Sequence, residues 1–366
     1  MIKITTPVLG EAELKEVKKV LDSGYLIQNK YVKEMEKFIS EYVGTKYAVA
    51  VSSGTAALHL SLIALGIKEG DEVIVPDFTF PATVNVVEIL GAKSIMVDID
   101  LETYCINTEA IESKITNKTK AIIPVQEFGN SSNMDEIIRI SRKYNLKIIE
   151  DAACALGTEY KSRKIGSLGD VACFSFHPRK SVTTGEGGII TTNDPKIYEK
   201  LEILRNHGIS KKEGKIDFVL PGYNYRLTEI QAAIGVIQLE KLEEIIDKKI
   251  KLAKIYNREL KNIKGIKIPG YKKDVRHTYQ TYYVILEESI DRDEVIKELR
   301  NKEIESNYGA YAIHTLKYYK EKYRLKDSDF ENSLKAYKQG LALPLSYEMT
   351  EEDVSFVIEN LKRIIQ

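Results

Sequence analysis

The sequence contains few cysteines and no long run of apolar residues. Its three cysteines, Cys105, Cys154 and Cys173, are odd in number and lack the CxxC spacing of zinc and redox sites. The opening residues 1–7 contain no apolar signal core. No segment approaches the roughly 20 apolar residues that a membrane-spanning helix needs. These features predict a soluble protein of the reducing cytoplasm.

The sequence also lacks an excess of charge of either sign. Its 54 basic and 54 acidic residues give a formal net charge of zero, so no overall field attracts nucleic acid or an anionic membrane. We therefore expect neither as a partner. The length of 366 residues exceeds that of one ordinary domain and predicts a large domain with a smaller companion.

Apolar, β-branched runs alternate with helical periodicity through the first two thirds of the chain. Seven such runs predict one largely parallel sheet that helices cover on both faces. The predicted strands are 47–52, 72–76, 94–98, 121–125, 147–151, 171–176 and 188–192. The predicted helices between them are 55–65, 81–90, 134–144 and 195–206. This repeated order of strand and helix is typical of an α/β fold.

The last third of the chain follows a different pattern. It is predicted to contain one long helix at 228–260, a strand at 281–286 and amphipathic helices at 291–300 and 351–365. This composition predicts a small α+β domain. We expect a large domain over residues 1–245 and a small C-terminal domain over residues 246–366.

Two local patterns have structural interpretations. Asn133 precedes a predicted helix and Glu136 stands at capping-box spacing, which predicts a capped N-terminus. Residues 317–326 are rich in lysine and tyrosine. This segment predicts a solvated helix face with tyrosines packed beneath it, and contact with a pyrophosphate is the alternative.

One lysine lies between a predicted strand and a glycine-rich turn. Lys180 follows the strand 171–176, and an upstream strand ends in the carboxylate of Asp151. A lysine amine can hold the aldehyde of pyridoxal 5'-phosphate (PLP), and an acid can keep the pyridine nitrogen protonated so that the ring accepts electrons. Lys180 and Asp151 therefore predict a PLP site.

A phosphate-binding turn is predicted where the strand 47–52 ends. Ser53, Gly54 and Thr55 stand at the start of the next helix, where backbone N–H groups attract an anion. An ordinary helix cap is the alternative, since serine and threonine commonly cap helices. The chain has no Walker pattern and no GxGxxG turn after a strand, so ATP and NAD are weak alternatives.

Taken together, these residues resemble the DegT/DnrJ/EryC1/StrS family of PLP-dependent nucleotide-sugar aminotransferases. Six motifs stand in the family's order and span nearly the whole chain. They are SGTAAL at 53–58, PDFTF at 76–80, VDID at 97–100, EDAA at 150–153, the Lys180 segment at 174–188 and GYNYRL at 222–227. The resemblance implies the type I PLP aminotransferase fold, with a seven-stranded, mostly parallel sheet between helices in the large domain.

The resemblance also implies roles for single residues. Lys180 would bind the cofactor covalently and move a proton between substrate and cofactor, and Asp151 would face the pyridine nitrogen. Phe80 would lie on the cofactor ring, although a core phenylalanine is the alternative. The cofactor phosphate would be bound by Ser53, Gly54, Thr55 and Ser175.

Three further positions resemble family residues that contact the neighbouring subunit or the substrate. Asn224 resembles the residue that reaches the phosphate of the neighbouring subunit, which implies a homodimer with shared active sites. Arg226 and His314 resemble positions near the sugar nucleotide. We also expect the surroundings of Lys180 to lower the pKa of its amine, so that it can shuttle the proton.

Two positions depart from the family pattern. Gln126 stands where the family usually has histidine, and glutamine cannot titrate near neutrality. Cys154 stands beside the cofactor where relatives commonly have Gln, His or Glu. A small buried apolar cysteine is the expected interpretation of Cys154. The contact to the cofactor's ring hydroxyl is then missing or comes from another residue.

The remaining histidines lack a second ligand at metal-binding spacing. His59, His177, His207 and His277 are therefore interpreted as structural, and no metal is expected.

The expected reaction is a two-stage transamination. L-Glutamate would convert PLP to pyridoxamine 5'-phosphate (PMP), whose amine is then passed to the ketone of a nucleotide-linked 6-deoxy sugar, as in polysaccharide biosynthesis. Similarity to members that act on 4-keto sugars at 2–7, 23–28, 176–178 and 312–315 implies C4, with C3 as the alternative. Some relatives are PLP-dependent sugar dehydratases with histidine at the lysine position. The presence of Lys180 argues against a dehydratase. A non-catalytic PLP-binding regulator is a further alternative.

Overall fold

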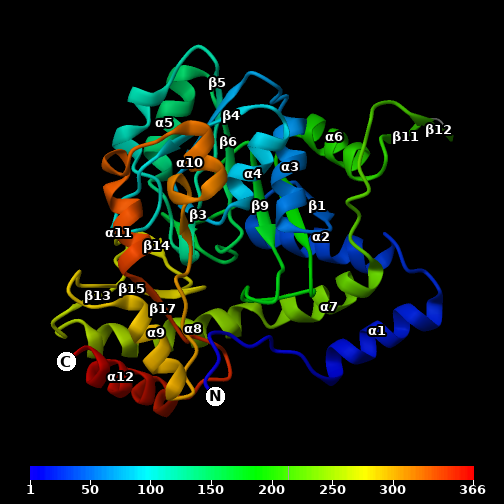
Figure 1. Ribbon diagram of the computed structural model, residues 1–366. Helices are drawn as coiled ribbons and strands as arrows, with labels where there is room; N and C mark the ends of the chain where they lie inside the picture. The colour runs from blue at the N-terminus through cyan, green and yellow to red at the C-terminus, as the bar shows by residue number, and fades with distance from the viewer. Residues whose placement is uncertain (213) are drawn as a thin grey trace.

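A computed structural model describes residues 1–212 and 214–366 as a large α/β body with a smaller unit beneath it (Figure 1). The seven predicted strands form one sheet in the order β1-β10-β9-β6-β5-β2-β4. Only β10 runs antiparallel to its neighbours, and the other pairs are parallel. The strands are β1 (Tyr47–Val51), β2 (Glu72–Pro76), β4 (Lys93–Val97), β5 (Thr119–Ile122), β6 (Lys147–Asp151), β9 (Val171–Ser175) and β10 (Gly188–Thr192). The prediction of a mostly parallel seven-stranded sheet is confirmed.

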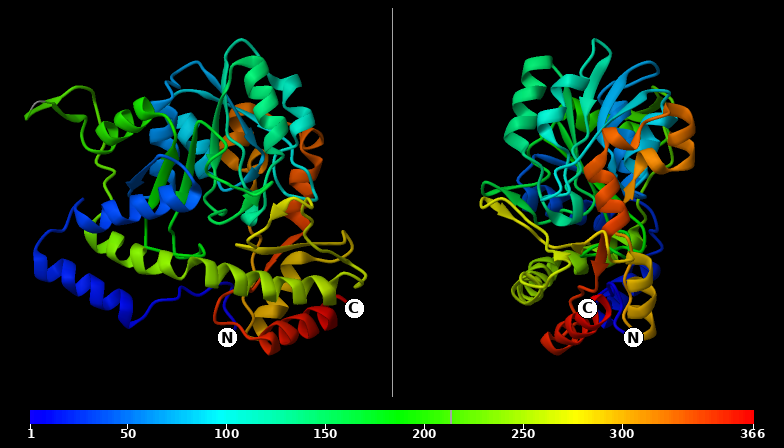
Figure 2. Two further views of the ribbon diagram at one scale, coloured as in Figure 1. Left: turned by 180° about the vertical axis from the view of Figure 1, so that it is seen from behind. Right: turned by 60° about the vertical axis from the view of Figure 1, so that its left-hand side comes forward.

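Helices cover both faces of this sheet (Figure 2). One apolar layer includes residues of α2 (Lys30–Val43), α5 (Met134–Tyr144) and α7 (Glu229–Glu240). The opposite layer includes residues of α3 (Gly54–Ala64), α4 (Ala82–Ile89) and α6 (Pro195–Arg205). Strand β2 shows how the sheet serves both layers, because Ile74 belongs to the first layer and Val73 and Val75 to the second. A strand buried on both faces therefore has a continuous apolar sequence.

The predicted helix at 228–260 is wrong in one respect. Two helices occupy the segment, α7 and α8 (Leu242–Leu260), and they meet at Lys241. Thr228 begins α7 with a capping box to Gln231. The apolar stripe continues through the break, so the periodicity did not reveal it. Leu239 and Leu242 on either side are both buried in the same apolar layer.

The predicted capping box at Asn133 is also wrong. Asn133 is the N-cap residue of α5, but its side chain makes no capping hydrogen bond. Its Oδ1 accepts a hydrogen bond from the Tyr160 hydroxyl at 3.1 Å. Glu136 instead pairs with Arg139. Contacts with Tyr160 and Arg139 therefore replace the predicted capping hydrogen bonds.

The C-terminal unit is built on a small antiparallel sheet. The sheet contains β13 (Ile266–Lys267), β15 (Tyr282–Leu286) and β17 (Gly340–Leu343). Its apolar cluster also contains residues of α8, α9 (Arg292–Asn301) and α12 (Glu351–Ile365). Ile2 pairs with Ile304 and packs on this cluster. The two chain termini thus lie on the same side of the molecule (Figure 1), and the boundary at residue 245 stays a prediction.

Several elements were not expected from the sequence. Two of them are α1 (Glu11–Ser23) and a hairpin of β11 (Ile209–Lys212) and β12 (Lys215–Phe218) that projects from the body (Figure 1). The same holds for α2, β13 and β17, and for α11 (Glu331–Gln339), β3 (Phe78–Thr79), β7 (Glu159–Tyr160), β8 (Arg163–Lys164), β14 (Val275–Arg276) and β16 (Tyr311–Ala312). The segment 317–326 contains α10 (Lys317–Tyr323), whose Tyr319 is buried and bonds to Asn85. This agrees with the predicted helix with tyrosines beneath it.

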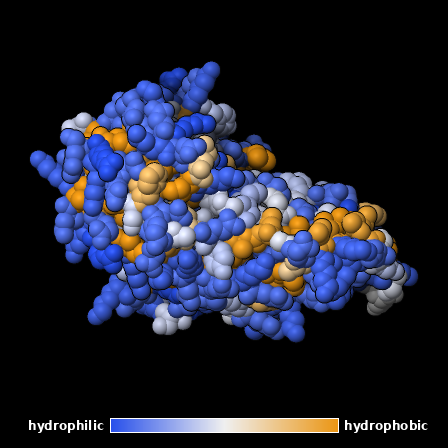
Figure 3. Space-filling model, turned by 90° about the horizontal axis from the view of Figure 1, so that it is seen from below, coloured by the Kyte–Doolittle hydropathy of each residue, from blue (hydrophilic) through white to orange (hydrophobic). Residues whose placement is uncertain are grey.

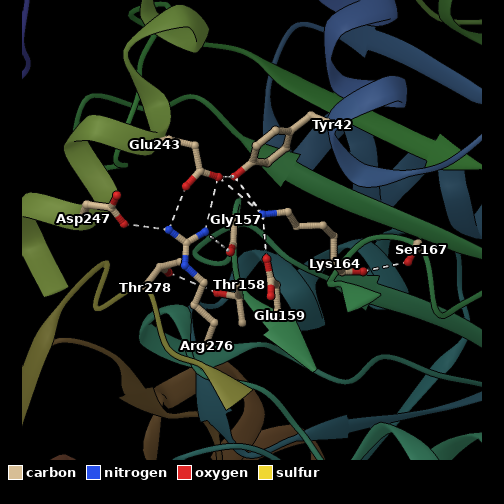
Figure 4. A network of polar contacts seen from close by, with 10 residues as sticks. All are labelled: Tyr42, Gly157, Thr158, Glu159, Lys164, Ser167, Glu243, Asp247, Arg276 and Thr278. Atoms are coloured by element: carbon tan, nitrogen blue, oxygen red, sulfur yellow. Dashed lines mark hydrogen bonds and ion pairs between the residues drawn. The ribbon is translucent and has the colours of Figure 1, made fainter. Parts of the chain in front are cut away.

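A polar network joins α8 to the large body (Figure 4). Arg276 of β14 forms ion pairs with Glu243 and Asp247 of α8, at 2.7 and 2.9 Å. Glu243 also accepts a hydrogen bond from Tyr42 of α2 and lies 3.4 Å from the amine of Lys164. These contacts connect elements that are remote in the sequence. Within residues 1–212 and 214–366, no helix is long and apolar enough to cross a membrane.

Candidate active site

A cavity of about 530 Å³ lies at the carboxyl ends of the parallel strands. Parallel α/β sheets commonly bind ligands at this edge. The sequence predictions for this site converge well, because eight of the nine proposed cofactor residues, including the catalytic pair, line one cavity. The predicted residues in its lining are Ser53, Gly54, Thr55, Phe80, Asp151, Cys154, Ser175 and Lys180.

Asp151 ends β6 and is buried at the floor of the cavity. Its Oδ2 accepts a hydrogen bond from the Thr83 hydroxyl at 2.7 Å, and its Oδ1 accepts one from the Ala153 N–H at 3.2 Å. Burial raises the pKa of Asp151, while these two donors and the Lys180 amine oppose the rise. The carboxylate is thus held in place, and a cationic group in the cavity would favour its ionised form.

Lys180 reaches the same cavity from the loop after β9. Its amine donates a hydrogen bond to the Cys154 sulfur at 3.0 Å. Burial acts to lower the pKa of Lys180, but attraction to Cys154, Glu127 and Asp151 outweighs it, and the pKa is raised. The prediction of a lowered pKa is therefore wrong for the chain itself, because the cavity collects acidic groups around the amine.

The start of α3 forms one end of the cavity. Ser53 is an N-cap residue whose Oγ accepts a hydrogen bond from the Ala56 N–H at 3.0 Å. The predicted cap and the predicted anion site thus occur together, since further N–H groups of this first turn remain for a ligand. Gly54 approaches Ser175 so closely that a Cβ on it would lie 2.9 Å from the Ser175 Cβ. This contact requires glycine.

Phe80 and Cys154 lie on other walls of the cavity. The Phe80 side chain is 63% exposed although it is large and apolar, which suits a ring that stacks on a planar ligand. Cys154 is half-buried and not a core residue. The interpretation of Cys154 as an apolar cysteine is therefore wrong, because its sulfur accepts a hydrogen bond from the Lys180 amine.

Glu127 is a site residue that sequence reasoning missed. It lines the cavity with Lys180 and Asp151. The side chain of Gln126 instead bonds to the Ser132 N–H and to the sulfur of Met134, at 2.7 and 3.2 Å, and it is fully buried. The signal that could have found Glu127 is its place just beyond the carboxyl end of a parallel strand.

The three positions that resemble partner or substrate contacts lie outside this cavity lining. Asn224 is exposed and pairs through its backbone with Asn206. Arg226 donates a hydrogen bond to the side chain of Asn206 at 2.6 Å. His314 is 1% exposed and its Nδ1 lies 2.6 Å from Asp77. His314 is thus held by Asp77 in a buried position, and its contact with the sugar nucleotide stays a prediction.

The other histidines differ among themselves. His59 and His277 are buried and hydrogen-bonded, as expected of structural residues. His177 instead lines the cavity, where its Nδ1 accepts a hydrogen bond from the Arg179 N–H at 3.2 Å. In the described part of the chain, no group of three or more His, Cys, Asp or Glu residues could hold a metal ion.

A second buried lysine lies close to the site. Lys249 of α8 is 2% exposed and donates a hydrogen bond to the Gln280 carbonyl at 2.8 Å. Burial lowers its pKa to about 7. Gln280 lines the cavity and its side chain donates to the Arg179 carbonyl at 2.7 Å. This chain of contacts supports the loop that carries Lys180, and only the tertiary structure revealed it.

The residues of the cavity fit PLP. A lysine amine, a buried carboxylate, an exposed aromatic ring and a helix N-terminus match the aldehyde, ring nitrogen, ring face and phosphate of this cofactor. The volume falls within the range of roughly 300–1,000 Å³ that is usual for ligand pockets.

Comparison with known proteins agrees with this chemistry. The family model of the DegT/DnrJ/EryC1/StrS aminotransferase family matches residues 7–362. The chain is 37% identical to the GDP-perosamine synthase of Escherichia coli O157:H7, over 98% of the chain and 97% of that protein. It is 36% identical to the spore coat polysaccharide biosynthesis protein SpsC of Bacillus subtilis, over 98% and 96%.

A solved structure is also closely similar. The PMP form of Spr1654 from Streptococcus pneumoniae superposes with a TM-score of 0.94 at 30% identity, covering 99% of this chain and 96% of that one. The fold and the site define a PLP-dependent sugar aminotransferase of the type I fold. The chain belongs to the DegT/DnrJ/EryC1/StrS aminotransferase family.

Proposed function

We propose that this enzyme transfers the amino group of L-glutamate to the C4 ketone of a nucleotide-linked 6-deoxy sugar. The observation that carries the proposal is the convergence of Lys180 and buried Asp151 on one cavity. PLP bound there supplies the electron sink of a transamination. The C4 position is supported by the sequence similarity to members that act on 4-keto sugars, and C3 is the alternative.

Each residue would perform a defined task. Lys180 would bind the cofactor and carry the proton, and Asp151 would hold a charge beside the ring nitrogen. The start of α3 and Ser175 would bind the phosphate, and Phe80 would cover the ring. Cys154 would contact Lys180 or the cofactor's edge.

We also propose a homodimer in which Asn224 reaches the partner's cofactor phosphate. Asn224 is exposed and outside its own subunit's cavity, as such a role requires. Apolar residues gather along the right-hand arm of the face in Figure 3, on the side where Figure 1 places α1. Leu14, Leu21 and Ile27 are each more than half exposed. Large apolar patches of this kind commonly mark protein interfaces.

The three free cysteines support the predicted cytoplasmic location.

The function is tested by incubating the enzyme with L-glutamate and a panel of 4-keto and 3-keto nucleotide sugars. The new amine is located by mass spectrometry and NMR. Amination at C4 supports the proposal, and amination of 3-keto substrates alone would replace it by the C3 alternative. Glutamate alone should change the visible spectrum of the bound cofactor. An unchanged spectrum would favour a different donor or a binding protein.

A further inference from the structure

Glu127 brings a second carboxylate to the catalytic lysine. The backbone after β5 runs beside the end of β6, where the Gln126 N–H donates a hydrogen bond to the Asp151 carbonyl at 2.9 Å. Glu127 follows at once and lines the cavity with Asp151 and Lys180. Its side chain is 5% exposed. A carboxylate buried this deeply is uncommon unless it has a partner.

The direction of the Glu127 side chain is fixed by its neighbours. Gln126 is anchored in the core by Ser132 and Met134. Phe128 packs on Tyr283 with ring centroids 4.5 Å apart and adopts a left-handed φ of 55°. Such a conformation is costly for a bulky residue and is retained where the surroundings impose it. With Gln126 and Phe128 both held in the core, Glu127 is left to face the cavity.

Glycine at position 129 completes this turn. Gly129 has a φ of +89°, and a Cβ on it would lie 2.4 Å from the Thr278 hydroxyl oxygen. Its carbonyl accepts hydrogen bonds from the Thr158 hydroxyl at 2.8 Å and from the Thr278 N–H at 3.0 Å. The segment is therefore held on both sides of Glu127, which keeps this residue in the lining of the cavity that also contains Lys180.

The charge of Glu127 depends on this location. Burial raises the pKa of Glu127 to about 8, with Lys180 acting to lower it and Asp151 to raise it. The positive charge of Lys180 and the Phe128 N–H are the groups that favour ionised Glu127. The titratable groups whose pKa is coupled electrostatically to Glu127 are Lys180, Asp151, Cys154, Cys105 and Tyr283.

We propose that Glu127 is a positioning residue whose ionisation controls the charge of the Lys180 amine. Ionised Glu127 retains the ammonium form, which cannot attack an aldehyde. Protonated Glu127 releases the amine to bind the cofactor. The adjacent Gln126 cannot supply this charge, because a glutamine does not titrate and its side chain is buried and bonded to the Ser132 N–H. This inference rests on the proposed role of Lys180.

The test measures how fast the full-length chain, freed of cofactor with hydroxylamine, captures added PLP. The rate of PLP capture is measured from the growth of visible absorbance between pH 6.5 and 9.5. At each pH it is divided by the rate at which Nα-acetyl-lysine reacts with PLP, so that the titration of PLP itself cancels from the ratio. The wild-type ratio should fall about tenfold around pH 8, since a change of one pKa unit is tenfold in free amine. Glu127→Gln should remove this fall.

Four variants make the result decisive. Glu127→Gln should match wild type at pH 6.5 and be about tenfold faster at pH 9.5, and Glu127→Asp should keep the wild-type fall. Glu109→Gln removes an exposed carboxylate outside the cavity and should change nothing. A flat wild-type profile, or Glu127→Gln with the wild-type profile, overturns the inference. Lys180→Ala should form no covalent chromophore; if it does, the proposed function fails instead. The wild-type profile decides even if a variant does not fold.

Discussion

The Lys180 amine and the Cys154 sulfur form a hydrogen-bonded pair, 3.0 Å apart, inside the cofactor cavity. The other two cysteines, Cys105 and Cys173, are each 1% exposed. Burial raises the pKa of all three thiols. Cys154 therefore differs from the others in access and in having a cationic neighbour.

This difference predicts one reactive thiol in the native, cofactor-free protein. A thiol reagent such as 5,5'-dithiobis(2-nitrobenzoate) should modify Cys154 alone, slowly at pH 7 and faster as the pH rises toward its raised pKa, because the thiolate is the nucleophile. Bound PLP should protect it. Cys154→Ala should abolish the reaction. Rapid modification of two or more thiols in the folded protein would contradict the assignment.

Thr83 is expected to keep Asp151 ionised. Thr83→Val removes the 2.7 Å hydrogen bond and should raise the already elevated pKa of Asp151 further. An Asp151 with a higher pKa stays protonated to a higher pH, so PLP affinity should fall more at pH 6 than at pH 8. The loss at pH 6 should be about tenfold, because the lost hydrogen bond is worth roughly 1.5 kcal/mol. Titration of the cofactor absorbance at both pH values measures this.

The matched control for this prediction is Thr79→Val. Thr79 also lines the cavity, and its hydroxyl lies 3.1 Å from that of Thr83, but it does not bond to Asp151. It should alter PLP affinity little at either pH. Equal losses in the two variants would show that the effect comes from the cavity wall and not from the carboxylate.

Asn224 should act across the subunit interface. Asn224→Ala should weaken PLP retention by roughly 1.5 to 3 kcal/mol, the value of a hydrogen bond to a charged group. Mixing and refolding this variant with Lys180→Ala should restore one tight site per mixed dimer, because the Lys180 subunit then receives Asn224 from its partner. Equilibrium dialysis of PLP counts these sites. If Asn224 acted within its own subunit, no mixed dimer would regain a tight site.

The network around Glu243 should contribute acid-sensitive stability. Burial acts to raise the pKa of Glu243, but Arg276 and Tyr42 outweigh it and lower the pKa to about 2. A lowered carboxyl pKa stabilises the fold above the unfolded pKa of roughly 4.3, and this stability is lost as the pH falls toward 2. Since Glu243 is half-exposed, Glu243→Gln should cost only about 1 kcal/mol at pH 7.

Thermal unfolding midpoints at pH 7, 4 and 3 test this prediction. The difference between wild type and Glu243→Gln should shrink as the pH falls. Glu41→Gln is the control, because Glu41 forms an exposed ion pair with Lys37 at 3.8 Å, and the substitution should cost a few tenths of a kcal/mol. A gap for Glu243→Gln that stays constant from pH 7 to 3 would contradict the role of its ionised form.

The sequence by itself determined the sheet and the centre of the site. The strands are buried on both faces, so their apolar runs are visible without any partner. Asp151 is the last residue of one such strand and Lys180 lies in the loop after another. A lysine and an acid at these places along the chain are enough to predict PLP chemistry. The phosphate-binding turn is equally local, because the first turn of a helix exposes its own N–H groups.

Only the tertiary structure decided which groups surround the lysine. Glu127, Cys154 and Thr83 come from separate segments, and their charges and pKa values depend on burial and neighbours that no local pattern records. The same reason explains why the pKa of Lys180 is raised where a lowered value was expected. Likewise, His314 pairs with Asp77, which is 237 positions away in the sequence. Local sequence specifies elements, while burial and long-range contacts specify the protonation and roles of side chains.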